Sequence, residues 1–517
     1  MTIVIAMSAC RSIPHEITRE SHEPCELDPR SAVTVDGLAT CVDCATTSFA
    51  VSVQTDSLAH RSLLQQQEFI GYSAGPARED HSQHQKSCGV STRMSHARAQ
   101  TTHEVIDMRY HTAQLTTAPR DLRMDAQIAR EPDFEALRKR AFNLRWAECP
   151  PDVIPLTAAD PDLPIAPAIT AALVRYITTP HLPYGPAAGL PEFRSAVAAH
   201  FMRTKSAEID PTRVIAANSA ASAITLVARE VLRAGDEVVV QDPVDFLVSE
   251  SVRRAGATIR LWRADNGRFT PDGLRDAWGN RTRALFVCHP HNPLGTLWSP
   301  AEVQAIAEFA SEREATLVSD EVWSDVVLDG RKFRSFAAHG DDTCHAWVVH
   351  GMSKGFAMAG LRVGSVIAPS RAAADTFVSN QGFAQTIEGV STLSQIAATA
   401  ALRDAGAWHS EFLAHCARLR DHAIKRLSKL EGVRIPRAPE ATFVLFANVQ
   451  ATAIAEDELA RRIERIARVR VVPGSPRWFG NGAAGHIRLS LATTREVLDE
   501  ALDRMQAAWQ DILHNAV

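Results

Sequence analysis

The feature that most constrains the fold of this chain is a regular alternation, from Asp133 onward, of short apolar segments with amphipathic helical segments. Apolar runs of this length between helical patterns are typical of buried strands. The alternation therefore predicts an α/β fold in which helices cover a mainly parallel sheet. The expected strands are 214–217, 237–241, 283–288, 315–319 and 346–350, and the expected helices include 220–232 and 300–310.

The pattern also predicts two domains. The alternation indicates a large domain at 165–395. Beyond it the helices lengthen, and apolar segments at 468–472 and 486–490 predict further strands. We expect these to belong to a smaller α+β domain, built from 125–164 together with 396–517.

The N-terminal segment 1–120 differs from the rest. It holds five of the nine cysteines and eight of the twenty histidines, and it shows no sustained periodicity. We expect a disordered or non-functional leader, with Met108 or Met124 as alternative starts of the functional chain. Cys41 and Cys44 have the spacing of half a zinc or redox site, but no second pair follows at standard spacing. We interpret the pair as incidental and predict no metal site.

Composition excludes several classes of protein. A net charge of -5 over 517 residues gives no strong field for a nucleic acid or an anionic membrane, and no apolar run approaches the length of a membrane span. Residues 1–10 lack the basic start of a signal peptide, and acidic residues follow them, which a mitochondrial presequence avoids. We expect a cytoplasmic protein without disulfides, nucleic-acid partner or membrane contact.

Lys354 occupies an unusual position. It follows almost directly after the expected buried strand 346–350, with Ser353 and small residues around it. Lysine is scarce in the chain, with seven against forty-eight arginines, and we expect the other six on the surface. A buried ammonium is costly unless it is neutralised or used covalently. Lys354 is therefore either a lysine of a surface loop or a chemically active group.

The segment 353–364 decides between these readings. Its pattern, Ser-Lys-x-Phe-x-x-x-Gly-Leu-Arg-x-Gly, resembles the segment of class I/II aminotransferases that binds pyridoxal 5′-phosphate (PLP). These are PLP-dependent enzymes of fold type I. Further motifs occur in the order expected for that family from about residue 130 to the C-terminus. The resemblance implies that Lys354 holds the cofactor covalently and acts as the catalytic base.

Three residues resemble those that contact the cofactor ring in that family. Asn292, in His-Pro-His-Asn-Pro-Leu-Gly, corresponds to the residue that hydrogen-bonds the phenolic oxygen. Asp320, at the end of an apolar strand, corresponds to the carboxylate that pairs with the pyridine nitrogen, and a protonated nitrogen makes the ring an electron sink. Trp323 stands where the family most often has tyrosine. An indole can donate a hydrogen bond but cannot ionise.

The resemblance also implies contacts to the cofactor's phosphate and ring face. A strand-to-helix junction favours an anion through free backbone N–H groups and the helix dipole. The expected phosphate residues are Ser219, Ala220, Ala221, Ser353 and Arg362. The stacking residue is left open between Asp245 and its neighbour Phe246, of which Phe246 is the candidate for cofactor binding. Tyr184, in Tyr-Gly-x-x-x-Gly-Leu-Pro, corresponds to a tyrosine that reaches the phosphate of the other subunit, which implies a homodimer with shared sites.

Arg488 completes the predicted site. Its segment, Gly-His-Ile-Arg-Leu-Ser, resembles the one whose arginine binds the substrate α-carboxylate, together with Asn292. A guanidinium offers a bidentate fork for such a group. The expected function is transfer of an amino group between an amino acid and a 2-oxo acid.

Two alternatives remain open. Residues 157–164 resemble a segment of cystathionine β-lyase-like enzymes, which implies a PLP-dependent carbon–sulfur β-lyase. A regulator that binds PLP without turnover is the third possibility, although residues 1–120 show no winged-helix pattern.

Overall fold

The computed structural model describes residues 3–5, 51–53, 131–339 and 345–514. The chain separates into two compact units, Met1–His111 and Thr112–Val517. In the first unit, β1 (Ile3–Ile5) pairs antiparallel with β2 (Val51–Val53). Outside the described residues lie most of the predicted leader 1–120 and, within or after it, Cys41, Cys44, Met108 and Met124.

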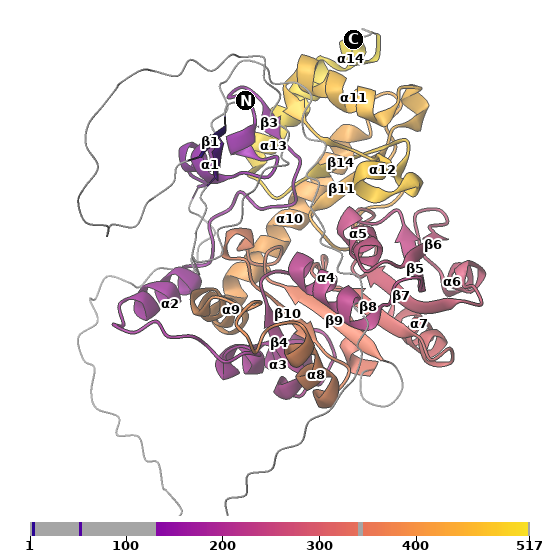
Figure 1. Cartoon of the computed structure of the whole chain (residues 1–517). Helices are drawn as coiled ribbons and strands as arrows, with labels where there is room; N and C mark the ends of the chain where they lie inside the picture. Colours follow the sequence, from indigo (N-terminus) through magenta and orange to yellow (C-terminus); the bar gives the residue numbers. More distant parts are fainter. Residues whose placement is uncertain (1–2, 6–50, 54–130, 340–344, 515–517) are drawn as a thin grey trace, which may run out of the picture. The chain divides into compact units, whose positions relative to one another are not determined.

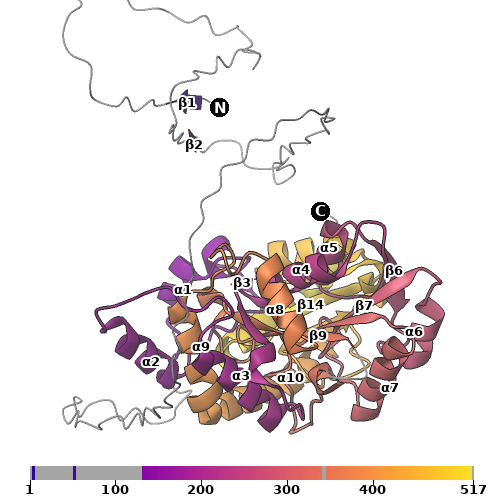
Figure 2. The same ribbon diagram turned by 60° about the horizontal axis from the view of Figure 1, so that its bottom comes forward.

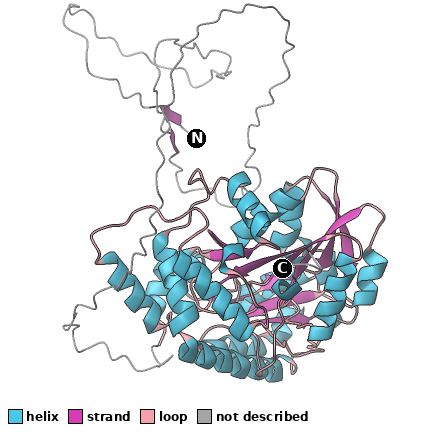
Figure 3. Ribbon diagram, turned by 90° about the horizontal axis from the view of Figure 1, so that it is seen from below, coloured by secondary structure: helices cyan, strands magenta, loops and turns pink. Residues whose placement is uncertain are grey.

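The second unit is built on a seven-stranded sheet in the order β4-β10-β9-β8-β7-β5-β6. Valine, isoleucine and leucine recur in most of these strands, and the five central ones are almost wholly buried because helices flank them (Figure 3). The strands are β4 (Val214–Ala217), β5 (Glu237–Asp242), β6 (Thr258–Arg263), β7 (Thr282–Cys288), β8 (Thr316–Asp320), β9 (Ala346–Gly351) and β10 (Gly364–Ile367).

The register of the parallel strands brings their carboxyl ends to one edge of the sheet. Cys288, the last residue of β7, lies opposite Asp320, the last residue of β8. Asp320 in turn lies opposite Val349, near the end of β9. Loops that follow aligned strand ends form the crevice where ligands bind in open α/β sheets.

Helices of the large part of the unit surround this sheet (Figure 2). α4 begins after the N-cap Ser219, whose Oγ accepts a hydrogen bond from Ser222 N, and it packs on β8, β9 and β10. Such a cap typically stabilises a helix by about 1 kcal/mol. The helices are α2 (Pro167–Ile177), α3 (Pro191–Thr204), α4 (Ala220–Val231), α5 (Phe246–Arg254), α6 (Pro271–Ala277), α7 (Pro300–Ser311), α8 (Arg371–Asn380) and α9 (Thr392–Asp404).

The C-terminal elements form a second hydrophobic core beside the sheet (Figure 1). α10 (Gly406–Leu427) joins the two cores, because Phe412 packs into the core of the sheet and Leu419 into the second core. The second core also takes Trp146 from an early part of the chain. Its strands and helices are β3 (Ile154–Pro155), β11 (Val444–Asn448), β12 (Val469–Arg470), β14 (His486–Ser490), α1 (Phe134–Arg140), α11 (Glu456–Arg462), α13 (Arg495–Ala507) and α14 (Trp509–His514). β13 (Val472–Pro473) and α12 (Pro476–Phe479) pack in a small third cluster with Phe446.

The sheet is mainly parallel, as expected, and one further strand, β10, runs antiparallel to both β9 and β4. The connection 352–363 from β9 to β10 contains no α-helix, whereas a parallel return usually runs through a helical crossover. The single strand expected at 468–472 is wrong. It divides at Val471 into β12, which pairs with β3, and β13, which pairs with β14.

Candidate active site

A cavity of about 390 Å³ lies where the loops after β5, β7, β8 and β9 meet β13, α12 and β14. Every predicted site residue except Tyr184 lines it. Tyr184 is 90% exposed on the surface of the single chain. The predicted residues that the fold brings together are Ser219, Ala220, Ala221, Phe246, Asn292, Asp320, Trp323, Ser353, Lys354, Arg362 and Arg488.

Lys354 projects into the cavity from the loop after β9. Its Nζ donates a hydrogen bond to the carbonyl oxygen of Ala159 (2.5 Å) and lies 5.6 Å from the centre of the Trp323 ring. Burial lowers the pKa of the Lys354 amine, although the carboxylates of Asp160 and Asp245 oppose this effect. A lowered pKa increases the share of the neutral amine, the form that attacks a carbonyl or takes up a proton.

Asp320 is a buried carboxylate at the end of β8. Its Oδ1 accepts a hydrogen bond from Val322 N (3.1 Å), and among the described residues no lysine or arginine forms an ion pair with it. Burial therefore raises the pKa of Asp320 to about 7. A carboxyl group held in this way gains most from a cationic partner that enters the cavity.

Arg488 and Asn292 meet at the junction of the two cores. Arg488, on β14, donates one hydrogen bond to Asn292 Oδ1 (3.2 Å) and one to the carbonyl oxygen of Thr157 (3.1 Å). Within the part of the chain that the structure describes, its Nε has no hydrogen-bond partner. Burial lowers the pKa of Arg488 to about 10, and Asp245 opposes this shift. The guanidinium thus retains capacity to bind an anion.

The residues predicted to bind phosphate surround the start of α4. Ser219 is its N-cap, Ala220 and Ala221 form its first turn, and Ser353 and Arg362 line the same cavity. Glycines allow this close packing. A Cβ atom on Gly364 would lie 2.9 Å from Ala220 N, and one on Gly351 would lie 3.2 Å from Val322 Cγ2. A helix N-terminus with a nearby guanidinium is suited to a phosphate group.

Other lining residues were not predicted from the sequence as site residues. Asp160 lies beside Lys354, and burial raises the pKa of its carboxyl group. Trp478 and Phe479 enter from α12. Asp245, the alternative to Phe246 at the stacking position, lines the cavity as the N-cap of α5. Its carboxylate accepts hydrogen bonds from Leu247 N (3.1 Å) and Asn292 Nδ2 (2.9 Å).

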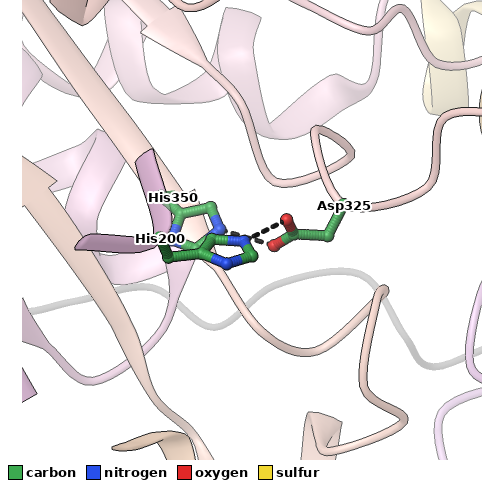
Figure 4. A group of neighbouring side chains, drawn as sticks. All are labelled: His200, Asp325 and His350. Atoms are coloured by element: carbon green, nitrogen blue, oxygen red, sulfur yellow. Dashed lines mark hydrogen bonds and ion pairs between the residues drawn. The ribbon is translucent and has the colours of Figure 1, made fainter. Parts of the chain in front are cut away.

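Figure 4 shows a second group of buried side chains, His200, Asp325 and His350. None of them lines this cavity. Asp325 accepts hydrogen bonds from His200 Nε2 (2.7 Å), His350 Nε2 (2.7 Å) and Lys205 Nζ (2.6 Å). The expectation that every lysine other than Lys354 lies on the surface is therefore wrong, because Lys205 is fully buried. Burial alone would raise the pKa of Asp325, but Lys205 and the two imidazoles hold it well below its usual range. The atoms of the His200, Asp325 and His350 group lie within 4.8 Å of one another, and Lys205 already supplies a cation to it.

The cavity fits PLP on three observations. A helix N-terminus and Arg362 can hold a phosphate, Asp320 lacks a cationic partner among the described residues, and the Lys354 amine reaches the space near Asp320. A pyridinium nitrogen would supply that cation, and an aldehyde would react with the amine. The fold and this site define a PLP-dependent enzyme of fold type I.

Comparison with known proteins identifies the family. Residues 151–505, more than half of the chain, match the profile of aminotransferase class I and II. A probable aspartate/prephenate aminotransferase of Aquifex aeolicus is 30% identical over 370 residues, 70% of this chain and 92% of that protein. One from Thermus aquaticus is 32% identical over 387 residues, 72% of this chain and 96% of that protein. The crystal structure of an aromatic aminotransferase from Pyrococcus horikoshii has a TM-score of 0.64 and 30% identity, covering 70% of this chain and 97% of that one.

The chain therefore belongs to the class I and II aminotransferases. It is a PLP-dependent enzyme that moves an amino group between an amino acid and a 2-oxo acid. The comparisons do not favour the carbon–sulfur β-lyase alternative, and the class is catalytic rather than purely regulatory. In the described residues, no helix combines the length and apolar character needed to cross a membrane.

Proposed function

We propose that Lys354 is the residue that holds the cofactor covalently and carries the substrate proton. The observation that carries this proposal is the lowered pKa of its buried amine, which lies among the carboxylates of the cavity. When bound, PLP supplies an aldehyde that takes up the substrate amino group and a ring that withdraws electrons from the substrate Cα. Lys354, once released by the substrate amine, removes the Cα proton and retains it for return.

The groups around Lys354 orient and tune the ring. Asp320 holds a proton on the ring nitrogen, because its buried carboxylate is stabilised by a cation at that position. Asn292 Nδ2 donates one hydrogen to Asp245, and its second hydrogen would bind the phenolic oxygen, while Oδ1 accepts from Arg488. Trp323 packs beside the Lys354 amine, and Phe246 lies at the cavity wall.

The remaining assignments concern the phosphate of the cofactor and the α-carboxylate of the substrate. Ser219, Ala220, Ala221, Ser353 and Arg362 bind the phosphate at the start of α4. Arg488 binds the substrate α-carboxylate through its unpaired Nε and its fork geometry, with Asn292 beside it.

We also propose that the enzyme is a homodimer in which Tyr184 reaches the phosphate of the other subunit. Large apolar side chains are exposed along α2 and the loop that follows it, which is unusual for a surface that faces only water. These side chains are Val174, Ile177, Leu182 and Tyr184. We propose in addition that the enzyme is located in the cytoplasm.

The domain division proposed from the sequence is supported by the two hydrophobic cores. The large domain 165–395 packs in the core of the sheet, and this core also takes residues of α9 and α10 up to Cys416. The second core combines Trp146 and Ile154 with residues after Leu419, as expected for a small domain made from 125–164 and 396–517.

Complementation between subunits tests the shared site. A Lys354→Ala chain and a Tyr184→Ala chain, each inactive or strongly impaired alone, are mixed under conditions of subunit exchange. Heterodimers then contain one site with both defects and one intact site, so about a quarter of the wild-type sites should return. Arg488→Ala is the control, because it acts on the same chain as Lys354 and should not be rescued by Lys354→Ala. A monomer by sedimentation, or no rescue by Tyr184→Ala, would contradict the shared site.

A further inference from the structure

One part of the cavity wall has a distinct chemistry. It combines an aromatic wall, formed by Phe246, Trp478 and Phe479, with the carboxylate of Asp245. We propose that this region selects an amino acid with an uncharged apolar side chain, preferably aromatic, and that Asp245 excludes side-chain carboxylates. This inference rests on the proposed roles of Lys354 and Arg488.

The aromatic wall brings together side chains from distant parts of the chain. Phe246, at the start of α5, meets Trp478 of α12 edge to face, with ring centroids 6.0 Å apart at 75°. Phe479 is buried beside them, and the Arg488 guanidinium lies 5.0 Å from its ring centre. Aromatic rings prefer such edge-to-face neighbours. A molecule held at Arg488 therefore lies against an aromatic surface.

Asp245 places negative charge at the same location. Its Oδ2 accepts a hydrogen bond from Asn292 Nδ2 (2.9 Å), while Asn292 Oδ1 accepts one from Arg488 (3.2 Å). Asp245 and Arg488 thus contact opposite ends of a single amide group. An anion bound at Arg488 lies within a few ångströms of a second, negative carboxylate in a partly water-excluded space. A substrate with an additional carboxylate meets repulsion there, which is a common basis of specificity.

Asp245 is held in this orientation from both sides. Leu247 N donates to its Oδ1 (3.1 Å), so the carboxylate caps α5 while it faces the cavity. An asparagine at this position retains a cap and a hydrogen-bond acceptor and removes the charge. The substitution Asp245→Asn therefore tests the effect of the negative charge while the shape of the side chain stays nearly the same.

The experiment follows the half-reaction of the full-length holoenzyme, in which an amino acid converts the bound PLP to pyridoxamine phosphate. This reaction needs no 2-oxo acid, so only the donor is compared. L-phenylalanine should react with a kcat/KM at least about tenfold above that of L-aspartate. Asp245→Asn should reduce this ratio by about tenfold, mainly through faster reaction of aspartate. Trp478→Ala should reduce it by loss of phenylalanine reactivity.

Two control variants match these changes outside the cavity. Asp210 caps a short helix on the surface, so Asp210→Asn removes a capping carboxylate without touching the site. Trp278 is half-buried against Phe309, as Trp478 is half-buried against Phe246, so Trp278→Ala removes a comparable indole. Both controls should leave the ratio unchanged.

The possible results separate two failures. A wild-type preference for aspartate, or an unchanged ratio in Asp245→Asn, would overturn the proposed specificity while leaving the proposed function intact. If a Lys354→Ala enzyme loaded with PLP converts it with L-phenylalanine at nearly the wild-type rate, the proposed function itself fails.

Discussion

Two groups of buried charges in this enzyme differ in how they are paired. In the cavity, Asp320 and Arg488 have pKa values shifted toward neutrality, to about 7 and about 10, because burial is not offset by an ion pair within the described residues. Around Asp325, by contrast, Lys205 and two histidines lie within hydrogen-bond distance, and the pKa of the carboxyl group is well below its usual range.

The difference indicates the purpose of each group. A charge that is satisfied by its own chain contributes to holding elements together, and here the Asp325 group joins α3, β9 and the loop after β8. A charge that is buried without a partner costs stability, and it is retained where a ligand provides the partner. The shifted groups of the cavity therefore mark the ligand site, whereas the Asp325 group is structural.

The largest expected effect concerns the Asp325 group. Asp325→Asn leaves the buried ammonium of Lys205 without its counter-charge. We expect the free energy of unfolding of the cofactor-free enzyme to fall by about 3–5 kcal/mol. Urea denaturation followed by circular dichroism measures this change. Asp320→Asn is the matched control and should not destabilise the cofactor-free enzyme, because it removes an unpaired charge. Similar losses for both variants would contradict the comparison.

The next effect concerns turnover. Asp320→Asn retains the shape of the side chain but removes the charge proposed to keep the ring nitrogen protonated. We expect kcat to fall by about 100-fold or more, with a normal far-ultraviolet spectrum. Steady-state kinetics at saturating PLP measures the change. A decrease of less than threefold would show that Asp320 does not have this role.

The smallest effect is a pH dependence of stability in the cofactor-free enzyme. The pKa of Asp320 in the folded protein is about 7, above its ordinary value of 3.8. The contribution of protonated Asp320 to the free energy of unfolding is therefore lost as the pH rises from about 4 through 7. Burial also raises the pKa of Glu321, to about 8, but Glu321 is present in wild type and in Asp320→Asn and affects the two proteins in the same way. Wild type should therefore lose stability relative to Asp320→Asn over this range.

For Asp325 we expect stability to change with pH in the opposite direction. Because its folded pKa is lowered, its contribution is present above pH 4 and is lost as the pH falls further. Denaturation curves at a series of pH values test both statements. If the free energy of unfolding changed with pH in the same way in wild type, Asp320→Asn and Asp325→Asn, the contrast between the unpaired Asp320 and the paired Asp325 would be wrong.

Much of the fold and part of the site could be predicted because they depend on local patterns. Lys354, Asp320 and Asn292 follow strands whose apolar runs are visible in the sequence, and aligned strand ends bring the residues after them together. The position of Arg488 follows from a motif, and its burial among the other groups is a property of the structure.

The remainder depends on contacts between distant segments. Trp478 reaches the cavity only because α12 packs beside α5, and nothing in its local sequence indicates that contact. Lys205 lies at the end of a helix, a context typical of the surface, and only the distant Asp325 explains its burial. The antiparallel placement of β10 likewise depends on its pairing partners.

Chemical labelling that distinguishes Lys354 from the buried Lys205 tests the central claim most directly. The holoenzyme is reduced with borohydride, digested and mapped by mass spectrometry. The account predicts a pyridoxyl adduct on the peptide that contains Lys354 and none on the peptide that contains Lys205, because Asp325 binds the Lys205 ammonium and the Lys354 amine faces the cavity. An adduct on Lys205 or on another lysine, with Lys354 unmodified, would contradict it.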